Sequence, residues 1–223
     1  MELLLPIDIK RLPEPIKYGH RLFLIGSCFT EHIGHALSEL KLKVLQNPHG
    51  ILFGPDSVCQ SLHDCIIGRQ YEKRELFYLN ECWNSWDHHS RFSSTSTDSA
   101  LRNINHSINE AHEFLSEANW LIITLGSSFF YSLTDEAIMA SREAGYPVAN
   151  CHRAPQSWFQ KKMMGTNDII VKLNESLNEL KKFNPAIKFI FTISPVRHIR
   201  DGVVENNRSK ARLISAIQEI TEN

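Results

Sequence analysis

The sequence predicts an α/β fold with a mainly parallel sheet, and two observations support this prediction. Four apolar runs are almost continuously hydrophobic rather than alternating, which suits parallel strands covered on both faces. They lie at residues 22–26, 43–46, 120–126 and 189–194. Helical patterns lie between and after these runs. Strands that alternate with helices are typical of an α/β domain with right-handed crossovers between parallel strands.

Apolar stripes with helical spacing predict the helices, over residues 33–40, 101–115, 170–180 and 213–220. The third stripe begins beside the capping candidates of residues 166–168 and stops before Pro185. The segment ELFYLNECWNSW fits this order less well. We interpret it as a hairpin insertion around residues 71–90, between the second and third core strands. Because no repeat or low-complexity linker divides the chain, we expect a single domain over residues 1–223.

Composition excludes several classes of partner. The 24 basic and 25 acidic residues leave no broad electrostatic footprint for nucleic acid or for an anionic membrane, so we expect neither as a partner. The apolar run before Pro6 is too short for a signal-peptide core or a membrane span. Five scattered cysteines without a CxxC pair argue against disulfides and against a thiolate zinc site. These features favour a cytoplasmic protein, and we expect no cofactor.

Polar motifs follow each predicted strand at the point where it ends. In order they are Gly26-Ser27-Cys28-Phe29-Thr30, Asn47-Pro48-His49-Gly50, Gly126-Ser127-Ser128 and Ser194-Pro195-Val196-Arg197-His198. Ligands bind outside the carboxyl ends of the strands in an open parallel sheet, so all four motifs are expected on one rim. Each motif alone has a structural explanation, since Gly26 can permit a tight turn and Cys28 can be a small buried hydrophobe. Their coincidence favours a functional site.

The first motif offers two adjacent nucleophiles at a strand-to-helix turn. Backbone N–H groups there can hold an oxyanion, and the helix dipole favours the thiolate of Cys28. Ser27 gains no such ionisation and needs an adjacent base. The N–H of Gly50 is a candidate second oxyanion donor, with the side chains of Asn47 and Ser128 as alternatives.

These motifs resemble the GSCFA family, with Thr30 in place of the alanine of its signature. The resemblance spans nearly the whole chain. Besides the first motif it rests on Asn47-Pro48-His49-Gly50-Ile51, Ser85-Trp86-Asp87-His88-His89-Ser90, Thr124-Leu125-Gly126-Ser127-Ser128, Asn150-Cys151-His152, Ser194-Pro195-Val196-Arg197-His198, Asp201-Gly202, Glu205-Asn206 and Ser209-Lys210. The family is placed among the SGNH-type hydrolases, which include esterases and acyl-group hydrolases, and its members are mostly bacterial. The resemblance therefore implies a flavodoxin-like, three-layer α/β/α fold and a hydrolase site.

The resemblance also implies roles for individual residues. An ungapped alignment with the Gly-Asp-Ser nucleophile block of SGNH enzymes sets Cys28 on the nucleophilic serine, whereas a one-residue shift restores Ser27. We favour Cys28 slightly. Gly50 resembles the glycine block and Gly126 the glycine of the third block, where Ser128 replaces an asparagine.

The late Asp-x-x-His block of SGNH enzymes is absent from the chain. Either the chain is truncated at its C-terminus, which we favour, or another histidine has taken the role. His198 is the best substitute because it follows a core strand, with His152 and His89 behind it.

The segment around Asp87, His88 and His89 has an alternative interpretation as a zinc site with Cys82. Adjacent histidines on an extended segment point in opposite directions, so no metal site is expected. We expect a substrate-contacting loop or a structural hairpin instead. Arg197 could bind a substrate carboxylate or phosphate, or pair with Asp201.

Together these features predict an ester hydrolase that forms an acyl-enzyme at Cys28 or Ser27. The expected substrate is a small-molecule or carbohydrate ester. An O-acyltransferase that delivers the acyl group to a sugar hydroxyl would use the same intermediate. A non-catalytic binding protein on the same scaffold is the alternative from another class.

Overall fold

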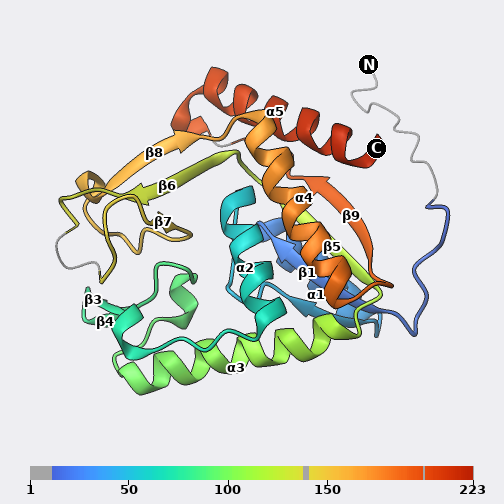
Figure 1. Ribbon diagram of the computed structural model, residues 1–223, viewed down its shortest axis with the longest axis horizontal. Helices are drawn as coiled ribbons and strands as arrows, with labels where there is room; N and C mark the ends of the chain where they lie inside the picture. Colours follow the sequence, from blue (N-terminus) through green and yellow to red (C-terminus); the bar gives the residue numbers. More distant parts are fainter. Residues whose placement is uncertain (1–11, 138–140, 198, 223) are drawn as a thin grey trace, which may run out of the picture.

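The structure is a computed structural model, and it describes residues 12–137, 141–197 and 199–222. Its centre is a parallel sheet in the order β2-β1-β5-β9, shown in Figure 1. The strands are β1 (Arg21–Gly26), β2 (Lys43–Gln46), β5 (Trp120–Leu125) and β9 (Lys188–Ile193). All three pairings are parallel, and each strand begins and ends within one residue of its predicted run.

Helices cover both faces of this sheet, which confirms the predicted three-layer α/β/α fold. The helices are α1 (Cys28–Glu39), α2 (Pro55–Ile67), α3 (Thr97–Ser116), α4 (Thr166–Phe183) and α5 (Val203–Glu222). Side chains of β1 alternate between the faces. Phe23 and Ile25 belong to a core with residues of α2 to α5, whereas Leu22 and Leu24 pack with Leu37 of α1.

Helix α2 was not predicted from the sequence, because its residues do not form a clear apolar stripe with helical spacing. Its buried positions include polar Ser61 and Asp64 beside Val58 and Leu62, so its inner face is not an uninterrupted hydrophobic stripe. The helix begins with Pro55 directly after Gly54, where proline's missing N–H costs nothing.

A β-rich part lies beside α2, away from the central sheet (Figure 1). It contains the antiparallel hairpin of β3 (Phe77–Leu79) and β4 (Cys82–Asn84), which confirms the predicted insertion. A second antiparallel sheet has the order β7-β6-β8 and was not predicted. Its strands are β6 (Phe129–Leu133), β7 (Pro147–Val148) and β8 (Phe159–Met163).

Short 3₁₀ helices lie at Lys73–Glu75, Ser90–Phe92, Gln156–Trp158 and Ile199–Asp201. Within the described part of the chain, none of the helices has both the length and the apolar character needed to span a bilayer.

Candidate functional site

The carboxyl ends of the parallel strands are joined to one another by hydrogen bonds. The N–H of Ser27, after β1, donates to the carbonyl of Thr124 in β5 at 3.1 Å. The N–H of Asn47, after β2, donates to Leu24 at 2.9 Å. Nζ of Lys210, from α5, donates to the carbonyl of Gly126 at 2.6 Å and also to that of Ser194 after β9. The strand-end motifs therefore share one rim, which we call the GSCF rim after residues 26–29.

Gly26 makes the turn from β1 into α1 possible. Its φ is +136°, and a Cβ there would lie 2.1 Å from the carbonyl oxygen of Thr124. A side chain would thus collide with the neighbouring strand, so the close approach of β1 and β5 requires glycine. The turn places Ser27 at the N-cap and Cys28 as the first residue of α1.

The two candidate nucleophiles differ in exposure. Ser27 is 2% exposed, and its Oγ is buried without a hydrogen-bond partner among the described residues. Cys28 is partly exposed and carries a free thiol. Since the first N–H groups of a helix have no intrahelical acceptor, those of Cys28 and Phe29 can bind an anion beside the thiol.

Asn47 and Gly50 shape the neighbouring loop. Asn47 is fully buried, and its side-chain oxygen accepts from the N–H of Gly26 at 2.8 Å. The N–H of Gly50 donates to the carbonyl of Asn47 at 2.8 Å. In this structure Asn47 therefore holds the turn of the first motif together, and the expected oxyanion donor at Gly50 is already bonded.

His89 lies against Gly50 and is partly exposed. A Cβ on Gly50 would come within 2.2 Å of the Cβ of His89. Nδ1 of His89 accepts from the N–H of Arg91 at 3.2 Å, so in the neutral ring the proton is on Nε2. Burial, and then the charge of Arg91, lower the pKa of His89, which favours this neutral form. Arg91 in turn donates to Glu31 of α1 at 2.7 Å.

The third motif is buried within the protein. Ser128 is fully buried, and its N–H and hydroxyl both donate to Oγ of Ser209 in α5, at 2.8 and 3.1 Å. The N–H of Gly126 donates to the carbonyl of Phe53 at 2.8 Å. These bonds tie α5 to the end of β5.

His152 is 8% exposed and lies near His89. Its Nε2 donates to the carbonyl of Ser85 at 2.7 Å, while its Nδ1 is buried without a partner among the described residues. Burial lowers the pKa of His152 to about 4, so the ring is neutral and Nδ1 is an unused acceptor.

The remaining candidates lie after β9. Arg197 is exposed, and its proposed partner Asp201 forms an ion pair with Lys161 of β8 instead. His198, the predicted substitute for the missing histidine, lies outside the described residues.

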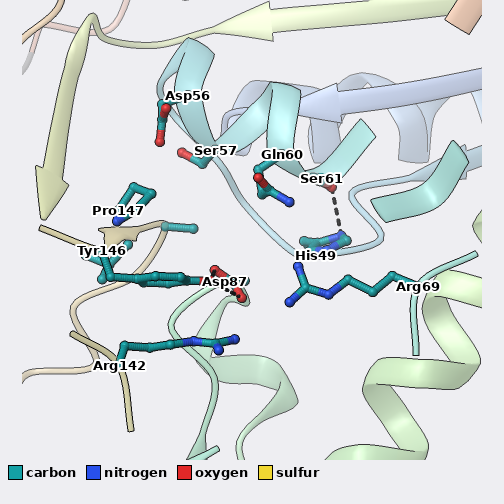
Figure 2. A pocket seen from close by; sticks show the side chains of 12 residues that line it. His49, Asp56, Ser57, Gln60, Ser61, Arg69, Asp87, Arg142, Tyr146 and Pro147 are labelled. Carbon is teal, nitrogen blue, oxygen red and sulfur yellow. Dashed lines mark hydrogen bonds between the residues drawn. The ribbon is translucent and has the colours of Figure 1, made fainter. Parts of the chain in front are cut away.

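A second group of polar side chains lines a cavity between α2 and β7, shown in Figure 2. Within it, the hydroxyl of Ser61 lies 2.7 Å from Nδ1 of His49, and Nε2 of His49 lies 3.1 Å from Oδ2 of Asp64. Although burial alone would raise the pKa of Asp64, the hydrogen bond from His49 and then the charge of Arg69 outweigh it and hold that pKa low. The ionised carboxylate accepts from Nε2, and Nδ1 accepts from Ser61.

This order of side chains matches the Ser-His-Asp sequence of serine hydrolases, but their burial argues against catalysis. Ser61 and His49 are 1% exposed and Asp64 is 0% exposed, so the network presents very little surface to a substrate. The network instead anchors the loop that contains His49 and Gly50 to α2.

A tyrosine connects this network to a second carboxyl group. Oη of Tyr71 lies 2.8 Å from Oδ2 of Asp64 and 3.0 Å from Oδ2 of Asp87. Burial raises the pKa of Asp87, although Tyr146 also donates to its carboxylate at 3.0 Å. The pKa values of the two carboxyl groups are therefore shifted in opposite directions, downward for Asp64 and upward for Asp87.

Adjacent histidines in the insertion point in opposite directions, as expected. His88 is fully buried and stacks on His49 with ring centroids 4.2 Å apart, whereas His89 faces the GSCF rim. Among the described residues, no group of three or more His, Cys, Asp or Glu side chains could hold a metal ion.

The cavity was not predicted from the sequence, because its two arginines come from segments without a motif. Arg69 follows α2, and Arg142 and Tyr146 precede β7. The only signal available was the polar spacing of Ser61 and Asp64, which places both on one face of a helix.

Comparison with known proteins identifies the family of the chain. The family model of the GSCFA family matches residues 21–223. The chain therefore belongs to the GSCFA family. No curated protein and no solved structure matches the chain.

Proposed function

We propose that the protein is an SGNH-type ester hydrolase that removes acyl groups from a small-molecule or carbohydrate ester, with Cys28 as its nucleophile. A cytoplasmic location is part of this proposal. The observation that carries it is the contrast at the strand-to-helix turn: the thiol of Cys28 is partly exposed beside N–H groups that have no acceptor within the helix, while the hydroxyl of Ser27 is buried.

The geometry supports the following reaction. Sγ of Cys28 attacks the ester carbonyl carbon, and the N–H groups of Cys28 and Phe29 stabilise the oxyanion. The C–O bond then breaks, and the alcohol leaves with a proton while a thioester remains on Cys28. Water hydrolyses the thioester, which releases the carboxylic acid and restores the thiol.

Proton transfer requires a base in addition to these groups. His198 is our candidate in this chain, because it follows the β9 strand in the sequence, within the last of the four strand-end motifs. His89 suits another role: its Nε2–H, fixed by the bond to Nδ1, can donate to the oxyanion or to a substrate hydroxyl.

Hydrolysis of short-chain p-nitrophenyl esters tests the proposal. We expect turnover by the wild-type protein and its loss in Cys28→Ala, with Ser27→Ala retaining activity. His198→Ala should lose activity if His198 is the base. His63→Ala is the matched control, because His63 lies on α2 in a surface pair with Glu179. Loss of turnover in Ser27→Ala but not in Cys28→Ala would refute Cys28 as nucleophile.

A non-catalytic binding role is the second candidate, and the bonded N–H groups of Gly50 and Gly126 favour it, because they leave fewer oxyanion donors than an SGNH site requires. Absence of turnover together with absence of labelling by thiol- or serine-directed acylating probes would support binding alone. An O-acyltransferase is identified separately, by transfer of the acyl group to an added sugar in preference to water.

A further inference from the structure

The cavity between α2 and β7 is separate from the GSCF rim. Its volume is about 220 Å³, and no residue of the first motif lines it. Arg69, which follows α2, and Arg142 and Tyr146, which precede β7, reach the cavity and point toward Asp87 (Figure 2). Ser57 and Gln60 of α2 line another side, and Pro147, Val148 and Ala149 supply an apolar wall.

Two guanidinium groups meet at this cavity with donors to spare. Both Arg69 and Arg142 donate to Oε1 of Glu75 at 2.8 Å, and Arg69 also donates to Asp64 at 3.2 Å. Nε of Arg142 is buried without an acceptor among the described residues. Each guanidinium carries more N–H donors than these bonds use, and a buried unpaired donor is costly unless a ligand supplies an acceptor.

The charges around the cavity favour a single negative charge on that ligand. Asp64 and Glu75 already form ion pairs with the two arginines. A dianion such as phosphate would therefore add more excess negative charge to the cavity than a monocarboxylate. Asp87, at 7% exposure, forms the floor between Tyr71 and Tyr146. Burial raises the pKa of Asp87, so its carboxyl group takes up a proton more readily than usual, and a protonated carboxyl group can donate to a neighbouring carboxylate.

We propose that this cavity binds a small carboxylic acid, whose carboxylate contacts the guanidinium groups of Arg142 and Arg69 and whose carbon chain lies against Val148 and Ala149. A planar guanidinium suits a carboxylate because it can donate two parallel hydrogen bonds. This binding function is independent of ester hydrolysis at Cys28.

Isothermal titration calorimetry tests the proposal with the monocarboxylates formate, acetate, propionate and butyrate, and with propionamide and inorganic phosphate for comparison. We expect at least one carboxylate to bind and propionamide, which lacks the charge, not to bind. Arg142→Gln should weaken the bound carboxylate about tenfold or more, since it removes a charge-assisted pair. Cys28→Ala should bind as the wild type does, which separates this site from the proposed active site.

Arg208→Gln is the matched control, because Arg208 lies on the surface of α5 and pairs only with the neighbouring Glu205 among the described residues. If circular dichroism shows that Arg142→Gln is unfolded, Arg142→Lys is measured instead and should show the same weakening, since lysine keeps the charge but lacks the planar fork. Absence of binding by all four carboxylates would overturn the proposal. So would tighter binding of phosphate than of every carboxylate, or undiminished binding by the Arg142 variant that folds.

Discussion

Replacing Asp64 with asparagine tests the buried network that supports the His49 loop. The carboxylate is 0% exposed and accepts from His49, Gln60, Arg69 and Tyr71 at distances from 2.8 to 3.2 Å. An asparagine at this position would keep the shape of the side chain but would present an NH₂ group to donors. The charge-assisted bonds to His49 and Arg69 would also be lost.

The size of the effect follows from these partners. Breaking a buried ion pair by removing one partner costs about 3–5 kcal/mol. Arg69 is 24% exposed and keeps its bond to Glu75, so we expect the lower end of that range. A loss of about 3 kcal/mol corresponds to a fall in Tm of about 6–12 °C for a chain of this size.

Urea denaturation at neutral pH, followed by circular dichroism, measures the free energy of unfolding of Asp64→Asn and the wild type. Glu179→Gln is the control, because the pair of Glu179 with His63 is partly exposed and should contribute less than about 1 kcal/mol. The pKa of Asp64 is lowered in the folded state, so its stabilisation is present above the unfolded pKa and is lost as pH falls through the folded pKa. The two unfolding curves should therefore converge in acid. A loss below about 1 kcal/mol at neutral pH would refute the network's structural role.

Three further predictions follow from other parts of the structure. Burial lowers the pKa of His152 from 6.5 to about 4. Between these pH values the unfolded chain binds an extra proton, so the free energy of unfolding should decrease as the pH is lowered from 6.5 to 4, by up to about 3 kcal/mol. Unfolding of His152→Gln measured from pH 7 to 4 should lack this contribution, and an unchanged slope would contradict it. Gly50→Ala should lower the free energy of unfolding by about 1–3 kcal/mol and should displace His89. Gly145→Ala is the control, because Gly145 has the same φ of +86° with no atom within 4 Å of an added Cβ, so it isolates the backbone cost. Thermal unfolding and ester turnover compare the two variants, and equal effects would show that the contact with His89 contributes nothing to either. Iodoacetamide should alkylate Cys28 in the folded protein but not Cys59 or Cys65, whose pKa values burial raises, and peptide mass spectrometry before and after addition of urea checks this order.

The central sheet could be predicted from sequence because its signal is strong. The two inner strands, β1 and β5, are buried by helices on both faces, so each is a short continuous apolar run, whereas the edge strands β2 and β9 are only partly buried. The antiparallel sheet gave no such signal. Strand β8, FQKKM, is only partly buried, and lysines occupy its centre, so its pairing with β6 depends on partners that are distant in sequence.

The candidate site was predicted in position but not in detail. The strand ends identify the rim, because the carboxyl ends of parallel strands meet at one edge. The sequence could not show that Ser128 bonds to Ser209 of α5, or that the N–H of Gly50 bonds to Asn47. Such bonds depend on side-chain orientation, which a strand-end motif does not specify.

His49 and Gly50 are consecutive residues that border different parts of the molecule: the imidazole of His49 lines the arginine-lined cavity, while Gly50 lies against His89 on the GSCF rim. The cavity and the GSCF rim therefore share a stretch of main chain, so a change of the backbone at one of them also reaches the other. Any attempt to redesign one of them, by substitution or by a tightly fitting inhibitor, should be judged by its effect on the other.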